Sequence, residues 1–163
     1  MNFKSSINKS LTYEPTNNEF IINYVENILH NSVKSNKKLY YFDILNETVD
    51  EDNIFKKKNN YQLLLDQSFQ EAGIFFFKKD IQQNYVRNIG LISLRNLNRL
   101  QKKDNTLYLE IYDNFHKIMN ILNFVGLDLF FNNNAVLNLY FRYLQKPNSI
   151  ILKNELIKNK IYV

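Results

Sequence analysis

The 163-residue chain contains no cysteine and two histidines, His30 and His116. Without cysteine, the protein cannot form a disulfide scaffold, a thiolate zinc site or a cysteine nucleophile. Two histidines also argue against a multi-histidine metal site. We therefore predict that the protein binds no metal and needs no cofactor.

Glycine is scarce as well, and the three glycines stand alone, which excludes a glycine-rich phosphate loop. Ser93 and His116 could be taken for a nucleophile and a base, but a helix-surface serine and a helical histidine explain them better. The acidic run at residues 50–52 lacks the ligand spacing of a cation site and is interpreted as a solvated loop. No catalytic constellation results, so we predict that the protein is not an enzyme.

Long apolar runs are absent too. No run approaches the roughly 18–20 residues that a membrane-spanning helix needs. The start "MNFKSSINKS" has no apolar segment typical of secretion, and it has serine and lysine but no arginine. We therefore expect no membrane span, no secretion signal and a poor mitochondrial import sequence.

What the chain does contain is enough apolar surface for a core, with 45% hydrophobic and 15% aromatic residues. Its length indicates one domain, or one domain with an extension. The sequence has 27 asparagines, 17 isoleucines and 17 lysines, but 4 arginines and no tryptophan. Asparagine, isoleucine and lysine have AT-rich codons, so this usage indicates an AT-rich genome, as in protist organelles, some large DNA viruses and some bacteria. Many asparagines are then compositional rather than functional.

The formal net charge of +5 is unevenly distributed. Residues 1–80 hold 10 basic and 11 acidic residues, a balance of −1, whereas residues 81–163 hold 11 and 5, a balance of +6. A basic half beside a neutral half indicates that the second half meets a polyanion. The neutral, aromatic-rich first half is better suited to contacts with protein.

Apolar periodicity predicts an extended arm at residues 1–17, followed by helices at 18–33, 61–72, 81–104 and 113–126. Alternating apolar residues predict strands at 105–112, 127–131 and 135–145. The predicted fold class is α+β, with two helices on one face of a small antiparallel or mixed sheet. From residue 81 the order is helix-strand-helix-strand-strand. This unit, residues 81–163, follows a mainly helical extension at residues 1–80.

The cations of the second half are the main candidate site. Arg95 and Arg99 are four residues apart and share a helix face, and Lys102 and Lys103 follow them. A second cluster near the C-terminal end contains Lys153, Lys158 and Lys160. Either the helix contacts phosphates, or it is an ordinary solvated amphipathic helix; composition alone favours neither.

The aromatic residues have two explanations as well. Tyr140, Phe141 and Tyr143 lie on a predicted strand, and stacking of bases on a sheet is one use of such a pattern. Packing in the core and at the sheet edge is the better explanation. The run "IFFF" at residues 74–77 is interpreted as buried or docked on another protein rather than as a ligand site.

The order of motifs in the second half resembles the N-terminal domain of the S-eight family of small-subunit ribosomal proteins. The segment "LRNLNR" is similar to the family's first-helix signature, with Leu94, Arg95 and Asn96 in the matching places. "LYLEIY" resembles the strand that follows, and "IMNILNFVGLDLFF" resembles the second helix and its exit at Gly126. "VLNLYFRYLQKPNSI" and "LIKNKIYV" resemble the hairpin and the closing segment.

The resemblance implies a structural constituent of the small ribosomal subunit that binds ribosomal RNA without catalysis. With the AT-rich usage, it implies a mitochondrial, organelle-encoded protein. Residues 1–80 would contact neighbouring ribosomal proteins, while the basic helix and the C-terminal basic segment would contact RNA, largely through its backbone. The implied RNA-binding residues are Arg87, Arg95, Asn96, Arg99, Lys102, Lys103, Lys153, Lys158 and Lys160.

The sequence also departs from the family pattern. Lys158, Asn159 and Lys160 stand where the family has Arg-Pro-Gly. The sequence ends at Val163, before the family's second domain, whose Ser/Thr-Ser-Gly loop contacts ribosomal RNA. That contact would have to be lost or supplied by another chain.

Two further hypotheses stay open. "NIGLISLRNLNRL" and "IMNILNFVGLDLFF" resemble the central and late helices of poxviral Bcl-2-like proteins, which are all-helical interaction modules. That hypothesis requires a helix at "VLNLYFRY", where the alternation predicts a strand. A generic nucleic-acid-binding adaptor shares the basic half but predicts no association with ribosomes.

Overall fold

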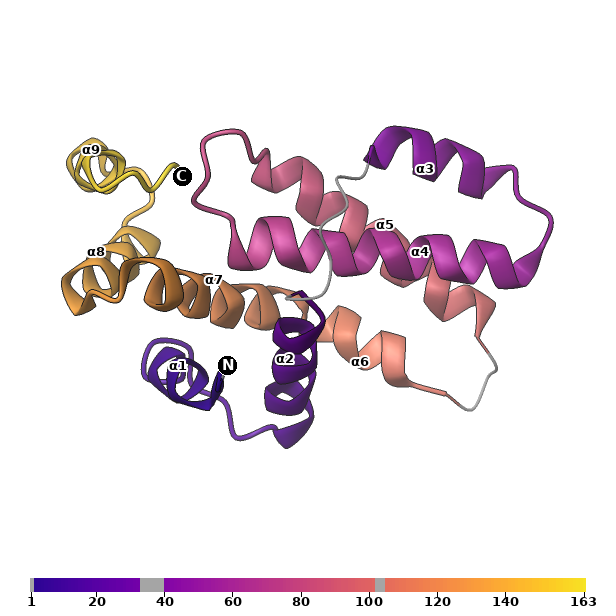
Figure 1. Ribbon diagram of the computed structural model, residues 1–163, viewed down its shortest axis with the longest axis horizontal. Coiled ribbons are helices and arrows are strands. Elements are labelled where there is room, and N and C mark those ends of the chain that lie inside the picture. The colour runs from indigo at the N-terminus through magenta and orange to yellow at the C-terminus, as the bar shows by residue number, and fades with distance from the viewer. Residues whose placement is uncertain (1, 33–39, 102–104) are drawn as a thin grey trace.

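The computed structural model describes residues 2–32, 40–101 and 105–163, and every secondary-structure element among them is a helix (Figure 1). In chain order these elements are α1 (Lys4–Ser10), α2 (Glu19–Ser32), α3 (Tyr41–Val49), α4 (Ile54–Ser68), the π-helical turn η1 (Phe69–Ile74), α5 (Gln83–Leu100), α6 (Leu107–Asp113), α7 (Phe115–Phe131), α8 (Asn134–Gln145) and α9 (Ile150–Lys158). Figure 1 shows α4 and α5 crossing the upper part of the molecule, α1 and α2 below α7, and α8 and α9 at one end.

The predicted α+β fold is wrong, because the three predicted strands are helical in the described residues. The segment 105–112 contributes to α6, 127–131 is the last part of α7, and 135–145 lies in α8. No sheet is present in the part of the chain that the structure describes.

Burial explains why α8 is a helix. Val136, Leu137 and Tyr140 are 4%, 1% and 3% exposed, and their spacing places them on one helix face. A strand would have sent the adjacent Val136 and Leu137 to opposite faces. The side chain of Asn133 caps the helix by accepting a hydrogen bond of 2.9 Å from the backbone N–H of Ala135.

The same reasoning applies to α6. Leu107, Leu109 and Ile111 would share one face of a strand, but only Ile111 is buried, at 1% exposure. Leu107 and Leu109 are 38% and 46% exposed. A single buried position in this short segment fits a helix of seven residues resting on the core better than a strand with a buried face.

Helix α7 runs past its predicted end at Gly126 and stops at Asn132, which adopts a left-handed conformation with φ 44°. Gly126 lies inside the helix, where the carbonyl oxygen of Ile74 in η1 approaches the glycine Cα so closely that a Cβ would overlap it. The glycine therefore serves close packing and not helix termination.

The core is organised around α7, in which ten of 17 residues are buried. One apolar cluster joins it to α2, α4, η1 and α5, and includes Leu64, Phe69, Leu94 and Phe115. Side chains from both sides of the predicted 80/81 boundary therefore meet in one core. A second, smaller cluster packs α7, α8, α9 and the turn after η1 around Phe76, Phe124, Tyr140 and Leu156.

The segment predicted as an extended arm, residues 1–17, contains α1, which is docked on α7. Ser6 Oγ donates a 2.7 Å hydrogen bond to one carboxylate oxygen of Asp128, and Lys9 Nζ lies 2.6 Å from the other.

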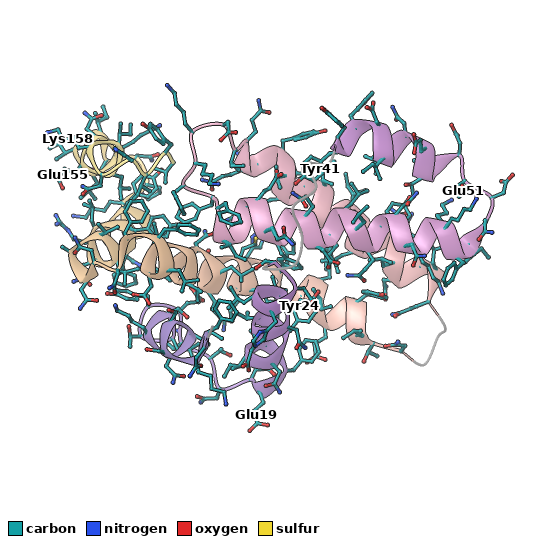
Figure 2. All side chains as sticks on the ribbon, in the orientation of Figure 1. Glu19, Tyr24, Tyr41, Glu51, Glu155 and Lys158 are labelled. Carbon is teal, nitrogen blue, oxygen red and sulfur yellow. The ribbon has the colours of Figure 1, made fainter. Side chains whose placement is uncertain are left out.

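None of the described helices has the length and apolar character required to cross a membrane. Figure 2 shows Glu51 and Lys158 on opposite ends of the long axis, with Tyr24 and Tyr41 between them.

Candidate functional site

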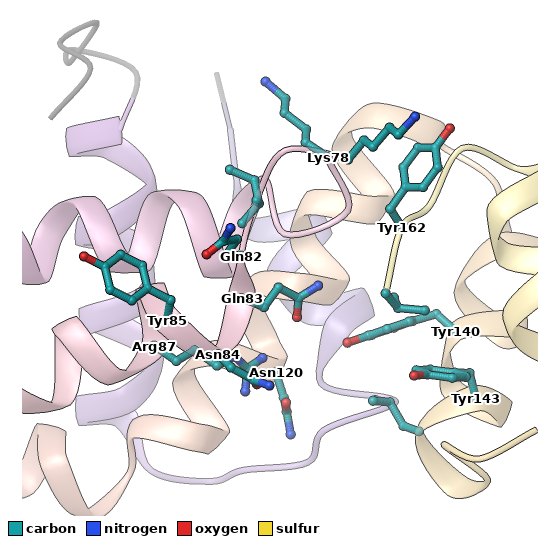
Figure 3. A pocket seen from close by; sticks show the side chains of 14 residues that line it. Lys78, Gln82, Gln83, Asn84, Tyr85, Arg87, Asn120, Tyr140, Tyr143 and Tyr162 are labelled. Carbon is teal, nitrogen blue, oxygen red and sulfur yellow. The ribbon is translucent and has the colours of Figure 1, made fainter. Parts of the chain in front are cut away.

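A groove of about 720 Å³ opens between the turn after η1, the start of α5, and α8 (Figure 3). The turn and α5 form one wall, α8 and the last residues form the other, and α7 contributes Asn120. Its lining residues are Lys78, Lys79, Ile81, Gln82, Gln83, Asn84, Tyr85, Arg87, Asn120, Tyr140, Tyr143, Leu144, Tyr162 and Val163.

The groove is basic and polar. Lys78, Lys79 and Arg87 contribute positive charge, and no aspartate or glutamate is among the lining residues. Amide groups of glutamine and asparagine and the hydroxyls of tyrosines supply hydrogen-bond donors and acceptors. Asp80 is exposed in the same turn as the lysines but does not line the groove. An anion would therefore meet cations and neutral donors there.

Arg87, at the base of the groove, lacks a counter-ion. No carboxylate of the described residues lies within ion-pair distance of its guanidinium. Burial lowers the pKa of Arg87 below its usual value, and the nearby Tyr140 partly opposes that shift. Its Nε is buried and donates to no acceptor among the residues that the structure describes. Unpaired buried donors are uncommon in folded proteins, so the Nε of Arg87 is available to an acceptor that enters the groove.

Asn123 of α7 holds this guanidinium in place. In the orientation that satisfies both ends of its amide, Asn123 accepts hydrogen bonds from Arg87 Nη2 at 3.2 Å and from the Tyr140 hydroxyl at 3.1 Å. Its nitrogen lies within hydrogen-bond distance of three carbonyl oxygens, those of Met119, Ala72 and Gly73, at 3.1, 3.0 and 2.8 Å. The network fixes one side of Arg87 and leaves Nε unpaired.

Tyr140 belongs to the floor of the groove and not to a stacking surface. It is 3% exposed, and burial raises its pKa to about 12, so the hydroxyl remains a proton donor at neutral pH. The neighbouring Tyr143 is half-buried, and its ring lies 6.5 Å from that of Tyr140. Figure 3 shows both hydroxyls pointing into the groove.

The first turn of α5 adds partial positive charge. Gln82 occupies the N-cap position, and its side chain makes no capping hydrogen bond. Gln83 instead donates from Nε2 to the carbonyl oxygen of Phe76 at 3.0 Å, which closes the preceding turn. Uncapped N–H groups at the start of a long helix favour an anion, and Gln82, Gln83 and Asn84 all line the groove.

Of the RNA-binding residues implied by the sequence, Arg87 lies in this groove. Arg95 and Arg99 line a separate hollow of about 230 Å³ near the other end of α5. There Arg95 Nη2 donates to the Tyr112 hydroxyl at 2.9 Å, and the guanidinium lies 5.5 Å from the ring centroid of Tyr112. Asn96 donates to the carbonyl oxygen of Ile92, on its own helix, at 2.9 Å.

The other implied residues are dispersed. Lys153, Lys158 and Lys160 are exposed on α9 and just after it, at the opposite end of the molecule from the C-terminal half of α5. The two predicted basic clusters therefore do not form one stripe. Lys102 and Lys103 lie outside the described residues.

Sequence reasoning missed Lys78 and Lys79, because they belong to the half of the chain whose net charge is near zero. Two adjacent lysines immediately before a predicted helix were the available signal. Their relation to Arg87 and α8 depends on packing between distant segments and has no local signature.

Comparison with known proteins found no matching family model, curated protein or solved structure.

Proposed function

We propose that the protein binds nucleic acid without catalysis and holds phosphate groups of the strand in the groove beside Arg87. The observation that carries the proposal is the unpaired, largely buried Arg87 at the base of a groove that contains two lysines and no acidic lining residue. A phosphate group has several oxygens that accept charge-assisted hydrogen bonds from a guanidinium and from ammonium groups, so it suits this set of donors.

Charge and shape favour a polymer over a small anion. The balance of +6 in residues 81–163 extends beyond the groove, and long-range attraction of this kind concentrates polyanions. Side chains from the turn after η1, α5, α7 and α8 line the groove, so it presents polar groups to more than one phosphate. Among the described residues that line it, the groove holds donors and cations that suit binding without a reaction.

A more specific proposal is that the nucleic acid is ribosomal RNA and that the protein is part of the small ribosomal subunit. The S-eight resemblance implied a sheet, and the described residues contain none, so the order of motifs is its remaining support. Sedimentation of the tagged protein with ribosomal subunits in its native organelle tests it. Migration apart from subunits at low salt would leave general nucleic-acid binding and exclude the ribosomal role.

A helical protein-interaction module is the second candidate, because the helix α8 provides what the Bcl-2-like hypothesis required at residues 136–143. The groove fits that candidate less well, since amphipathic helices dock in apolar grooves. Exposed apolar side chains instead gather near the α3–α4 turn, where Val49, Ile54 and Phe55 are 60%, 59% and 73% exposed. Calorimetric titration with an amphipathic helical peptide, repeated with Phe55→Ala, tests this candidate.

The decisive experiment for nucleic-acid binding is fluorescence anisotropy with a labelled RNA oligonucleotide at several salt concentrations. Three phosphate contacts on a single strand correspond to a slope of about −2 when the logarithm of the binding constant is plotted against the logarithm of the salt concentration. This log–log salt slope means roughly a 20-fold loss of affinity between about 50 and about 200 mM salt. Both exposed lysines of the groove are reversed in Lys78→Glu/Lys79→Glu, which should weaken binding at least tenfold.

The matched control reverses two exposed lysines on α9, in Lys153→Glu/Lys158→Glu. This variant has the same net charge as the groove variant and should lose much less affinity. Equal losses in the two variants would mean that net charge alone attracts RNA, and the groove would have no specific role. Absence of RNA binding by the unaltered protein at low salt would overturn the proposal itself.

A further inference from the structure

Tyr85 connects the basic groove to a second hollow. It lines the groove and also a neighbouring depression of about 290 Å³ whose other lining residues are Tyr40, Tyr41, Phe42 and Asp43. Tyr40, Phe42 and Tyr85 are 69%, 66% and 43% exposed, although aromatic side chains of this size are normally buried. The exposed aromatic rings therefore begin where the basic groove ends.

Tyr85 is held in position despite its exposure. Its ring packs against the buried ring of Tyr41 at right angles, with the ring centroids 6.3 Å apart. Because Tyr41 is 8% exposed, its ring is fixed by the core and restricts the orientation of Tyr85. An aromatic ring that is oriented in advance loses little entropy when a flat ligand stacks on it.

The two hollows differ in what they can accept. Among the described residues, three cationic side chains and no acidic side chain line the groove, whereas four aromatic rings and the carboxylate of Asp43 line the second hollow. A phosphate therefore fits the groove better than the aromatic hollow. A base fits the second, because every base presents a π-face to an aromatic side chain.

We propose that the groove and the aromatic hollow together bind an unpaired nucleic-acid strand, with phosphates at Arg87, Lys78 and Lys79 and a base stacked on Tyr85. This inference rests on the proposed function and narrows its ligand to single strands. In a duplex the bases are stacked on one another and their faces are covered, so Tyr85 has nothing to stack on. Duplex RNA therefore gains only the phosphate contacts.

The test compares three probes by fluorescence anisotropy and competition. They are a single-stranded RNA, a duplex RNA of the same length, and inorganic polyphosphate as a competitor that has phosphates but no bases. Tyr85→Ala should weaken single-strand binding about tenfold, the effect of losing one stacked base, and leave the salt slope unchanged. Duplex binding and competition by polyphosphate should be the same for Tyr85→Ala and the unaltered protein.

Two further variants separate stacking from general damage. Tyr85→Phe retains the ring and should bind single strands as the unaltered protein does. Phe55→Ala removes an aromatic ring at the α3–α4 turn that is more exposed than Tyr85, and it should have no effect on binding. A 2-aminopurine base placed in the single strand should be quenched on binding to the unaltered protein and to Tyr85→Phe, but much less with Tyr85→Ala.

The outcomes distinguish the two proposals. Duplex binding as tight as single-strand binding, or unchanged affinity in Tyr85→Ala, would overturn the single-strand inference. If Lys78→Glu/Lys79→Glu still lost affinity in that case, nucleic-acid binding at the groove would stand. If neither RNA probe bound, both proposals would fail together.

Discussion

The carbonyl oxygen of Ile74 in η1 lies against Gly126 of α7, with no room between them for a side-chain carbon. This backbone contact places the π-helical turn directly on the central helix. The turn that follows η1 carries Lys78 and Lys79, so the contact also determines where one wall of the groove lies.

We expect Gly126→Ala to lower the free energy of unfolding by about 1–3 kcal/mol, because the two backbones must separate. Gly73→Ala is the comparison substitution, since its Cβ would meet the side chain of Leu122, 2.9 Å from Cδ1 and 3.0 Å from Cβ, and not a backbone atom. The difference between the two variants reports the extra cost of the backbone contact at Gly126. Urea denaturation measures it, and a larger loss for Gly73→Ala would contradict the assignment.

Asn123→Ala should lower the free energy of unfolding by about 2–4 kcal/mol. The change leaves carbonyl oxygens of η1 and the Nη2 of Arg87 without their hydrogen-bond partner in a buried site. Tyr140→Phe removes one hydroxyl from the same network and should lose only about 1 kcal/mol. Thermal denaturation of both variants provides the comparison, and equal effects would indicate that Asn123 acts only by filling space.

Arg87→Met tests whether the arginine is present for binding or for stability. A methionine fills similar space without an unpaired buried charge, so stability should be unchanged or higher. RNA affinity should fall, and the log–log salt slope should become shallower by about 0.7, the value for one phosphate contact on a single strand. Anisotropy and urea denaturation on the same sample give both values. A destabilised protein that retained full affinity would show that Arg87 is structural.

Stability should decline in alkaline solution because buried tyrosines must ionise on unfolding. Burial raises the pKa of Tyr140 to about 12 and raises those of Tyr24 and Tyr41 as well. Each folded-state pKa lies above the unfolded value of about 10, so the stabilising contribution is complete below pH 10 and is lost as pH rises toward the folded pKa. Each such tyrosine steepens the loss by about 1.4 kcal/mol per pH unit.

Denaturation monitored by circular dichroism at several pH values above 10 measures how the free energy of unfolding changes with pH. Tyr140→Phe should reduce this slope by about 1.4 kcal/mol per pH unit, which corresponds to one proton, since one ionising group is removed. A slope that is the same in Tyr140→Phe would mean that Tyr140 ionises equally in the folded and unfolded protein.

Asp128→Ala should release α1 from α7. The carboxylate accepts from Ser6 and pairs with Lys9, and hydrogen bonds to a charged group contribute about 1.5–3 kcal/mol. Hydrogen exchange in residues 4–10 should therefore accelerate, with little change in α5. Asp113→Ala, which alters an exposed aspartate on α6, is the control and should leave α1 protected.

Local patterns predicted the long helices well. The helices predicted at residues 18–33 and 81–104 correspond to α2 and α5, and the one predicted from residue 113 corresponds to the first part of α7. In these segments apolar residues recur at helical spacing over several turns, so one buried face exists whatever packs on it. The overall absence of cysteine and the uneven charge could also be read without a structure.

The predicted strands are wrong because their sequences fit both the two-residue period of a strand and the 3.6-residue period of a helix. In residues 136–143 apolar and aromatic residues are so dense that both an alternating and a helical face can be drawn. Contact of Val136, Leu137 and Tyr140 with Phe76 and Phe124 selects the helical face. Gly126 similarly resembles a glycine that ends a helix. It lies inside α7 instead, where the carbonyl oxygen of Ile74 leaves no room for a side chain.

The sequence by itself determined that the second half is basic and that Arg87 is among its cations. Only the tertiary structure decided which cations act together. Packing of η1 and of α8 on α7 places Lys78, Lys79 and Arg87 around one groove, and Arg95 and Arg99 lie apart from the lysines of α9. The physical reason is that helix propensity and the spacing of apolar residues act locally and allow more than one buried face. The contacts between segments distant in the sequence determine which of these faces is buried.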